Sequence, residues 1–364
     1  MSLNQLCSSS WYLYLNHHWL TVAFLCGFVT DLLLLNRIDD TFDNAVLLFY
    51  VVLATASLVL FYSGVAELGP RWWVRSLTRF TPITMQYAFG GLLSGMLIFY
   101  GRSGDLVASA PFLALIIGVI VANEVVKKRS DRLLYNISIY FIGIFSYCVL
   151  IVPVWLGKTG DWIFYGSGLL AVAITMFVIK LLKWVIPNFL TMQKRLLVFC
   201  VGCLYVLFNT FYFFNFIPPI PLSLTELSIF QAVERNQTTG IYTITKSTPN
   251  WYQKIPGWPL TFSPTTGGGA ACFARVYAPT ALKTNVVQRW EYKDANGDWQ
   301  ERYKQSYAIS GENKNGYRGF TALSSVASGD WRCSVENERG QVLGRKVFTV
   351  ATSRSPQNLV TVTE

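Results

Sequence analysis

The stretch RLLVFCVGCLYVLFNTFYFFNFIPPIPLSL, residues 195–224, divides the chain into two regions of different character. Its first part is an apolar run of the length, about 20 residues, that a helix needs to cross the hydrocarbon core of a bilayer. Three prolines within four residues, beginning at Pro218, then end the helix. Long runs of Leu, Ile, Val and Phe precede Pro218, and polar, turn-rich sequence follows it. We therefore predict a membrane region followed by a region exposed to water.

The composition supports a membrane protein. Of the 364 residues, 52% are hydrophobic and 14% are charged, whereas roughly 25% of residues are charged in soluble domains. The formal net charge is +10. The basic residues are concentrated in alternate short loops between the apolar segments, which is typical of a membrane protein, so no nucleic-acid partner is expected.

Seven apolar segments are long enough to cross a bilayer as helices. They are residues 18–36, 44–63, 84–101, 109–126, 133–155, 162–184 and 195–217. Residues 1–217 are therefore predicted to form a bundle of about seven transmembrane helices. The N-terminus has no Lys or Arg ahead of its first apolar run and no small-residue cleavage site, so the first span is expected to be retained.

The charges of the loops predict the orientation of the chain. The loops 65–83, 127–132 and 180–195 are rich in Lys and Arg, whereas the other short loops contain more Asp than Lys and Arg. Lys and Arg are retained on the cytoplasmic side of a membrane. The N-terminus is therefore predicted to be cytoplasmic, and the C-terminal region to lie outside.

The first basic loop contains the stretch GPRWWVRSLTRFTP, residues 69–82. Its aromatic and basic side chains suit the headgroup region, where Trp rings and guanidinium groups both find partners. We predict an interfacial anchor made of Arg71, Trp72, Trp73, Arg75 and Arg79. A dedicated lipid-binding role is the alternative to simple anchoring, and membrane lipids are partners in either case.

The C-terminal region alternates with a period of two from Cys272 onward, where Cys272, Ala274 and Val276 share one face. That alternation predicts strands with one buried face. The stretch KDANGDW supplies an Asn-Gly hairpin turn at residues 296–297. We predict a connector and stem over residues 218–269, an all-β, immunoglobulin-like sandwich over 270–352 and a flexible tail over 353–364.

Cys272 and Cys333 are the two cysteines of the predicted outer domain, and the other five of the seven lie in or beside apolar segments. Trp290 lies between the two cysteines in the sequence. This order is similar to that of immunoglobulin domains, in which two bridged cysteines pack on a tryptophan. An oxidising compartment allows the bridge. We predict a Cys272–Cys333 disulfide, with two separate buried thiols as the alternative.

Several strings in order, among them GFVTDLLLLNRIDD, QYAFGGLLSGMLIFYGRSG, FIPPIPLSL, ACFARVYAP, GYRGFT and GDWRCSVENERGQVLGRKVFTV, are similar to a known group of proteins. The chain resembles an uncharacterised bacterial family of multi-span membrane proteins with domain of unknown function 2914 at the C-terminus. The resemblance implies a Gram-negative inner-membrane protein with a periplasmic domain, and no known reaction, ligand or cofactor. The family often has a histidine two residues before the tryptophan, where this chain has Gln288.

Polar residues inside predicted spans are costly and are often functional. The candidates for an intramembrane polar site are Asp31, Arg37, Asp39, Gln86, Asn123 and Glu124. The alternative is that these residues form ordinary pairs at helix ends, for example Asp31 with Arg37.

In the outer domain, Trp299, Tyr317 and Arg318 are candidates for an aromatic and basic ligand surface, with Arg318 suited to an anionic glycan or phosphate. Trp331 alternates with Cys333 and is expected in the core. The sequence has no nucleophile elbow, His-Glu metal motif or dinucleotide fingerprint, which favours a non-enzymatic role without cofactor or metal.

Three functions fit these observations. The first is an envelope protein whose membrane anchor presents a sandwich domain that binds a periplasmic glycan or protein. The alternative is a membrane-embedded transporter or lipid-modifying enzyme that uses the polar residues within the spans. A seven-span receptor ranks third, because the short cytoplasmic loops offer no output domain.

Overall fold

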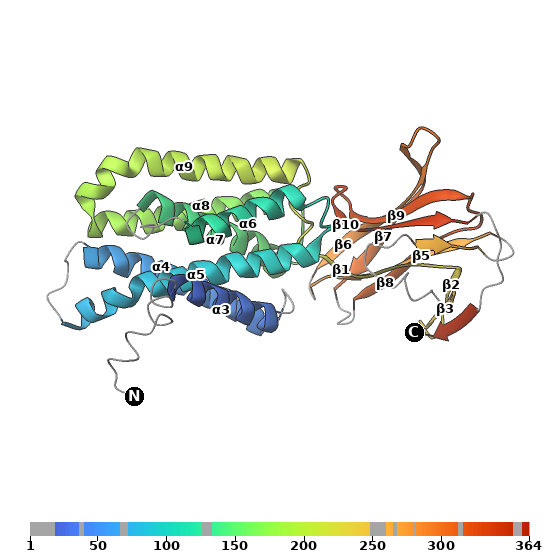
Figure 1. Ribbon diagram of the computed structural model, residues 1–364, viewed down its shortest axis with the longest axis horizontal. Helices are drawn as coiled ribbons and strands as arrows, with labels where there is room; N and C mark the ends of the chain where they lie inside the picture. Colours follow the sequence, from blue (N-terminus) through green and yellow to red (C-terminus); the bar gives the residue numbers. More distant parts are fainter. Residues whose placement is uncertain are drawn as a thin grey trace, which may run out of the picture. The chain divides into compact units, whose positions relative to one another are not determined.

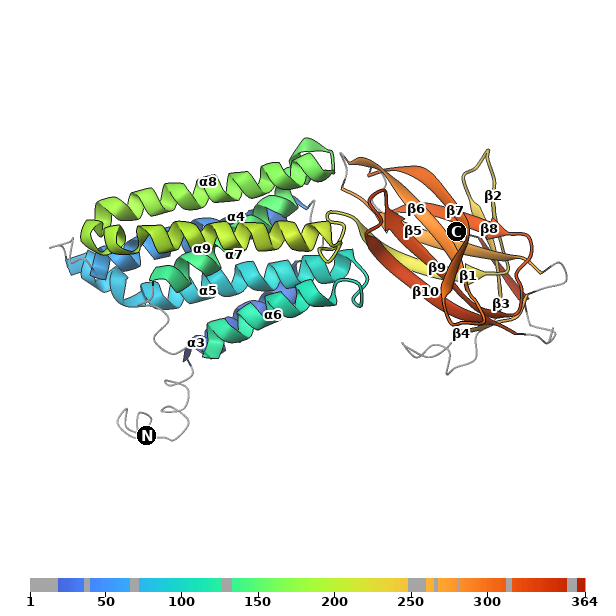
Figure 2. The same ribbon diagram turned by 90° about the horizontal axis from the view of Figure 1, so that it is seen from above.

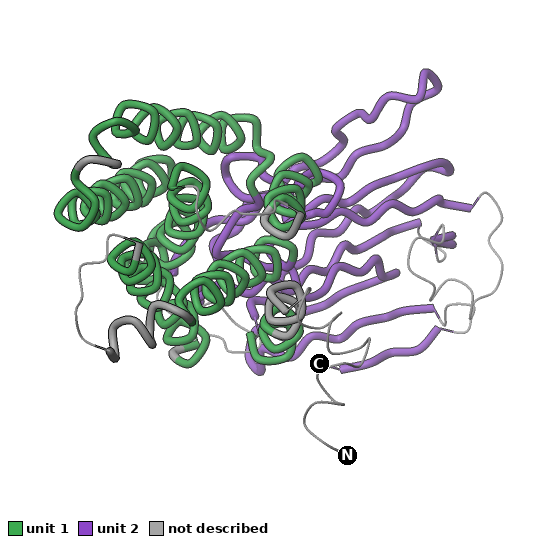
Figure 3. Tube along the Cα trace, turned by 60° about the vertical axis from the view of Figure 1, so that its left-hand side comes forward, with its two compact units in different colours: residues 1–101, 110–217 green, residues 102–109, 218–364 purple. Residues whose placement is uncertain are grey.

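The computed structural model describes residues 19–35, 40–65, 72–125, 133–247, 260–264, 268–279, 282–311, 316–351 and 359–363. Within these ranges, the side chains of residues 19–26, 41, 65, 72–79, 123–125 and 188–189 are outside the description. The chain forms two compact units (Figure 3). A helical unit comprises residues 1–101 and 110–217, and a β unit comprises residues 102–109 and 218–364.

The helical unit contains long helices that run side by side (Figures 1 and 2). In the described residues they are α3 (Trp19–Leu34), α4 (Thr41–Val65), α5 (Trp72–Ser103), α6 (Ala110–Val125), α7 (Leu133–Leu156), α8 (Asp161–Val185) and α9 (Pro187–Phe213). Five of them, α4, α5, α7, α8 and α9, contain stretches long and apolar enough to cross a membrane. The chain therefore has the character of a multi-pass membrane protein, while α3 and α6, at 16 residues each, are shorter.

Helix α7 is apolar and buried around most of its circumference. Its Phe145 ring contacts Phe164 of α8 and Phe208 of α9, with ring centroids 5.8 and 4.4 Å apart. Gly168 of α8 permits this close packing, because a Cβ there would lie 2.7 Å from the ring of Tyr205 and 2.9 Å from that of Phe145. A helix that is apolar all round is a helix enclosed by others.

Helix α5 is longer than the predicted span 84–101. Residues 72–82 of the stretch predicted to lie at the interface are the first part of a continuous helix that runs through Pro82. A proline removes one backbone hydrogen bond from a helix interior, and neighbouring helices in a membrane protein compensate for that loss.

The β unit is built from strands of three sheets (Figure 1). The described strands are β1 (Ser223–Phe230), β2 (Ala232–Arg235), β3 (Tyr242–Ser247), β4 (Leu260–Phe262), β5 (Ala270–Tyr277), β6 (Lys283–Lys293), β7 (Trp299–Ser310), β8 (Tyr317–Leu323), β9 (Gly329–Asn337), β10 (Val342–Val350) and β11 (Leu359–Thr363). The sheet orders are β1-β5-β8, β4-β10-β9-β6-β7 and β11-β3-β2.

The sheets β1-β5-β8 and β4-β10-β9-β6-β7 face each other across two apolar clusters, in which side chains of β5 meet side chains of β6, β9 and β10. The small sheet packs on the other face of β5, where Tyr242 and Ile244 cover Ala271 and Phe273. Strand β5 is consequently buried on both faces. Its face made of Cys272, Ala274 and Val276 agrees with the predicted alternation.

The segment predicted as connector and stem, residues 218–269, contributes strands to the sheets. Strand β1 pairs antiparallel with β5, and β4 pairs in parallel with β10. Strand β11, within the predicted tail 353–364, pairs with β3. These partners are far apart in the sequence, and a local pattern does not reveal long-range pairing. The predicted two-layer immunoglobulin-like sandwich did not include the third sheet.

The predicted disulfide is confirmed. Cys272 of β5 and Cys333 of β9 are bonded, 61 residues apart, and both are fully buried. Trp290 is also fully buried and packs edge-on against Phe348, with ring centroids 6.1 Å apart. Trp331 is 5% exposed, as its alternation with Cys333 predicted. The bond joins the two large sheets through their common core.

Trp290 is further fixed by its indole N–H, which donates a hydrogen bond of 2.8 Å to the Thr321 hydroxyl of β8. The isosteric change Thr321→Val is expected to lower the free energy of unfolding by about 2 kcal/mol, because the buried N–H loses its partner. Denaturant unfolding of the full chain measures this. The control is Thr349→Val, whose hydroxyl bonds Asp330 at an exposed position, with an expected change under about 0.5 kcal/mol. Equal effects of the two changes would contradict the assignment.

Candidate functional site

A row of charged side chains crosses the sheet β1-β5-β8. Arg318 of β8 lies directly opposite Arg275 of β5, and Glu226 of β1 lies opposite Arg275 on its other side. Glu226 and Arg275 form an ion pair of 3.3 Å. Like charges directly opposite each other on a sheet are unfavourable. The negative charge of Glu226 balances the positive charge of Arg275, so the positive charge of Arg318 remains.

The Nε of Arg318 is buried and has no hydrogen-bond partner among the described residues. Buried polar atoms in proteins are usually bonded, and an unbonded guanidinium N–H calls for an acceptor. Arg318 as a whole residue is half-buried, so part of it is open to solvent.

Strand β3 of the small sheet brings an aromatic ring to the row. The Tyr242 hydroxyl donates a 2.9 Å hydrogen bond to the carbonyl of Arg318, and the guanidinium of Arg235 lies 5.7 Å from the centre of the Tyr242 ring. Burial raises the pKa of Tyr242, while the charges of Arg235 and Arg318 act in the opposite direction. We call Arg235, Tyr242, Arg275 and Arg318 the arginine patch.

Tyr317, the predicted neighbour of Arg318 in the ligand surface, has a packing role. Its ring stacks on Tyr307 of β7 with centroids 6.0 Å apart, and it packs against the apolar core. Tyr307 in turn lies against Gly319, where a Cβ would be 2.5 Å from the Tyr307 ring. Tyr317 thus supports the strand that carries Arg318.

The structure does not bring Trp299 together with Tyr317 and Arg318. Trp299 is the first residue of β7, and Tyr307, which contacts Tyr317, is the ninth, about 26 Å further along an extended strand. Trp299 instead lies under two cations, with Arg332 at 4.5 Å and Lys293 at 5.9 Å from its ring centre. The predicted surface is therefore two separate surfaces.

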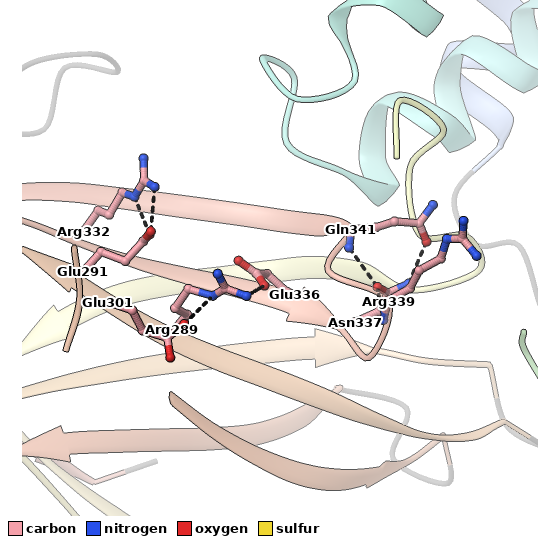
Figure 4. A network of polar contacts seen from close by, with 8 residues as sticks. All are labelled: Arg289, Glu291, Glu301, Arg332, Glu336, Asn337, Arg339 and Gln341. Carbon is pink, nitrogen blue, oxygen red and sulfur yellow. Dashed lines mark hydrogen bonds and ion pairs between the residues drawn. The ribbon is translucent and has the colours of Figure 1, made fainter. Parts of the chain in front are cut away.

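Two guanidinium groups on this face of the sheet, those of Arg332 and Arg289, are engaged by carboxylates (Figure 4). Arg332 binds Glu291 through two hydrogen bonds, one of 2.7 Å. Arg289 pairs with Glu336 at 2.9 Å and with Glu301 at 3.6 Å. Burial raises the pKa of Glu336, and the charge of Arg289 opposes that rise. These two guanidinium groups have carboxylate partners, whereas no carboxylate is paired with Arg318 among the described residues, so we place the candidate anion site at the arginine patch.

The hairpin that carries Trp299 turns within the predicted stretch, one residue earlier than predicted: the Gly297 N–H donates to the carbonyl of Asp294 at 3.1 Å, so Ala295 and Asn296 are the central residues. The carboxylate of Asp294 accepts hydrogen bonds from the backbone N–H groups of Asp298 and Asn296, both of 2.9 Å. These bonds, the one from Asp298 foremost, hold the pKa of Asp294 below its usual value. Gly297 adopts a φ of 89°, which glycine alone tolerates without strain.

In the helical unit, the structure surrounds Asp31 of α3 with hydroxyl groups. Tyr50 of α4 donates to one carboxylate oxygen at 2.6 Å, and Ser94 of α5 is bonded to the other. Asp31 is fully buried. Sequence reasoning missed Tyr50 and Ser94, because Tyr and Ser are common in apolar helices and no local pattern marks these two.

The other predicted intramembrane residues are not gathered at Asp31. Gln86 of α5 is 2% exposed, and its amide has no hydrogen-bond partner among the described residues. It lies eight residues before Ser94, about 12 Å along the helix. Asn123 and Glu124 are in α6, but their side chains are outside the description, and Arg37 and Asp39 lie outside the described residues altogether.

The interfacial anchor can be followed only in its backbone. Arg71 lies outside the described residues, and Trp72, Trp73, Arg75 and Arg79 are in α5 without described side chains. In the described part of the chain, no group of three or more His, Cys, Asp or Glu side chains is placed to hold a metal ion.

Comparisons with known proteins identify the C-terminal part. Residues 283–350 match the family described as "Protein of unknown function (DUF2914)". The matched stretch begins with β6 and ends with β10, and it includes Arg318, Trp299 and Cys333. The resemblance predicted for this part of the chain is thus confirmed.

The wider comparisons add no function. No curated protein matches the chain. Among solved structures, the alkylpurine DNA glycosylase AlkC of Pseudomonas fluorescens, bound to DNA containing an abasic site analog, has 8% sequence identity, a TM-score of 0.24 and coverage of 87% of this chain and 100% of that chain. A TM-score this low indicates no common fold, so nothing is inferred from it.

Proposed function

We propose that the chain is an inner-membrane protein of a Gram-negative envelope and that its β unit is a periplasmic module that binds an anionic polymer. The apolar helices and the alternation of basic and acidic loops support about seven spans with a cytoplasmic N-terminus. The Cys272–Cys333 disulfide suits the oxidising periplasm.

We infer the class of ligand from the arginine patch. The guanidinium of Arg235 lies over the Tyr242 ring, and the Tyr242 hydroxyl bonds the carbonyl of Arg318. Arg275 lies opposite Arg318 on the sheet, with Glu226 as its compensating carboxylate. Guanidinium groups bind carboxylate and phosphate through paired N–H donors. The ligand is therefore an envelope glycan that carries phosphate or carboxylate groups, and a protein partner is the competing outcome.

Binding of such a glycan is expected to depend on Arg318. We expect Arg318→Ala to weaken capture of a phosphate-bearing glycan fraction by full-length protein in nanodiscs about tenfold or more, because hydrogen bonds to a charged group are lost. Arg318→Lys should bind with intermediate affinity, since Lys keeps the charge and loses the paired donors. Added salt should weaken binding by the wild type. Equilibrium capture of labelled glycan measures each effect.

Two variants of the same protein serve as controls. Lys304→Ala removes one positive charge from the exposed strand β7 and should leave binding unchanged. Trp299→Ala tests the second surface. If Arg318→Ala binds as well as the wild type, the arginine patch is not the site. If the wild type instead captures a protein and Trp299→Ala loses it, the module recognises a protein at the face of Figure 4.

A further inference from the structure

Asp31 stands out in the helical unit because it is fully buried and its partners are hydroxyl groups. Tyr50 contributes one from α4 and Ser94 contributes one from α5. Within the described part of the chain, no cationic side chain pairs with Asp31. An ionised carboxylate enclosed in an apolar bundle without a cation is strongly unfavourable, and such groups become neutral by binding a proton.

The hydrogen bonds around Ser94 fit a protonated Asp31. The Ser94 Oγ lies within hydrogen-bond distance of Asp31 Oδ2 and also of the Gly91 carbonyl oxygen, at 3.1 Å from the latter. A serine hydroxyl has one proton and cannot donate to both. If Asp31 carries a proton on Oδ2, it donates to Ser94, and Ser94 donates to Gly91. Tyr50 donates to Oδ1, so each of the three protons has an acceptor.

The same geometry also accepts the ionised state. When the proton leaves, rotation of the Ser94 hydroxyl turns its proton from Gly91 to Asp31 Oδ2. The carboxylate then receives two hydrogen bonds, from Ser94 and Tyr50. No backbone movement is required for this exchange, because one hydroxyl serves either as acceptor or as donor.

Of the described titratable groups near this site, Asp31 is the carboxylic acid that contacts the hydroxyl groups of both Ser94 and Tyr50. The titratable groups of α4 in this region are Tyr50 and Asp43. Asp43 is buried and lies seven residues before Tyr50, about 10 Å along the helix. That of α5 is Tyr87, whose ring lies edge-on to Tyr50 with centroids 5.7 Å apart. The described side chains of α3, residues 27–34, include no other charged group.

Polar pairs continue along α4 from this site. Ser57 donates to Thr84 of α5 at 3.2 Å, Thr55 and Tyr140 of α7 share a hydrogen bond of 2.8 Å, and Asn136 of α7 donates to Tyr62 at 3.0 Å. Tyr50 and Tyr62 are 12 residues apart, about 18 Å along the helix. Side chains that can hydrogen-bond thus recur along α4 from Tyr50 to Tyr62.

We propose that Asp31 is a proton-binding site of the helical unit. Its carboxylate takes up one proton from water and returns it to water, Ser94 and Tyr50 stabilise both states, and the polar pairs along α4 provide the route. The ligand is the proton, and the site does not depend on glycan binding by the β unit.

Infrared difference spectroscopy of the full chain in nanodiscs tests the proposal directly. We expect a pH-dependent carbonyl band of a protonated carboxylic acid in the wild type. The band should be lost in Asp31→Asn and retained in Asp43→Asn, the control that removes the other buried aspartate of this region. In Ser94→Ala the midpoint of the titration should shift, because Ser94 bonds the carboxyl group in both of its states.

Two results would overturn the proposal. One is a wild-type spectrum in which no protonated acid depends on Asp31 at any pH at which the protein stays folded, which would mean that the carboxylate remains ionised. The other is a midpoint that is identical in wild type, Ser94→Ala and Tyr50→Phe. Asn is isosteric with Asp, so we expect Asp31→Asn to fold, and elution as a single species checks this. If Asp31→Asn aggregates, the titration midpoints of Ser94→Ala and Tyr50→Phe decide the matter.

Discussion

Replacement of both Cys272 and Cys333 by alanine is expected to lower the free energy of unfolding of the β unit by about 4 kcal/mol or more. The bond closes a loop of 61 residues. In a chain-entropy model, its loss raises the conformational entropy of the unfolded chain, which lowers the free energy of unfolding by that amount. Both sulfur atoms are also fully buried between the two large sheets, so the change leaves an unfilled space beside Trp290. Denaturant unfolding of the full chain, followed by tryptophan fluorescence, measures the loss.

The matched control is Cys203→Ala in α9, where the thiol is free and exposed. This variant should unfold as the wild type does. The reductant dithiothreitol should destabilise the wild type and should not destabilise the double alanine variant further. A double variant within about 1 kcal/mol of the wild type would show that the bridge adds little to the stability of the core.

The sequence predicted those parts of the fold that rest on local patterns. Apolar length marked the helices, and alternation marked the buried face of Cys272, Ala274 and Val276. The third sheet was not predicted, because its hairpin β2-β3 lies in the segment interpreted as a stem and its other strand, β11, is more than 100 residues further along the chain. Burial of Phe273 on the second face of β5 follows from that sheet alone.

The candidate sites show the same limit. Arg318 could be selected from its residue type, whereas its neighbours Arg235 and Arg275 come from strands separated from it by 83 and 43 positions in the numbering of the chain. Likewise Asp31 was a candidate because a charge in a span is costly. Its partners Tyr50 and Ser94 are visible only once three helices have packed.

Gly311→Ala is expected to destabilise the β unit by about 3 kcal/mol or more. Gly311 follows β7, and its N–H donates a 3.0 Å hydrogen bond to the carbonyl of Leu282, the residue immediately before β6. A Cβ at this position would lie 1.6 Å from the carbonyl oxygen of Pro279 and 2.8 Å from that of Ala278. These atoms belong to backbone, so the clash cannot be relieved by turning a side chain. The end of the β6–β7 pair would have to open.

Denaturant unfolding of the full chain should show this loss, and the control is the same substitution in α9, Gly202→Ala. A Cβ at Gly202 meets nothing within 4 Å, and alanine favours a helix over glycine by about 1 kcal/mol, so this variant should be neutral or slightly more stable. If Gly311→Ala unfolds at the denaturant concentration of the wild type, the backbone of residues 278–279 does not pack against Gly311 in solution. The connection between β5 and β6 would then follow a different path.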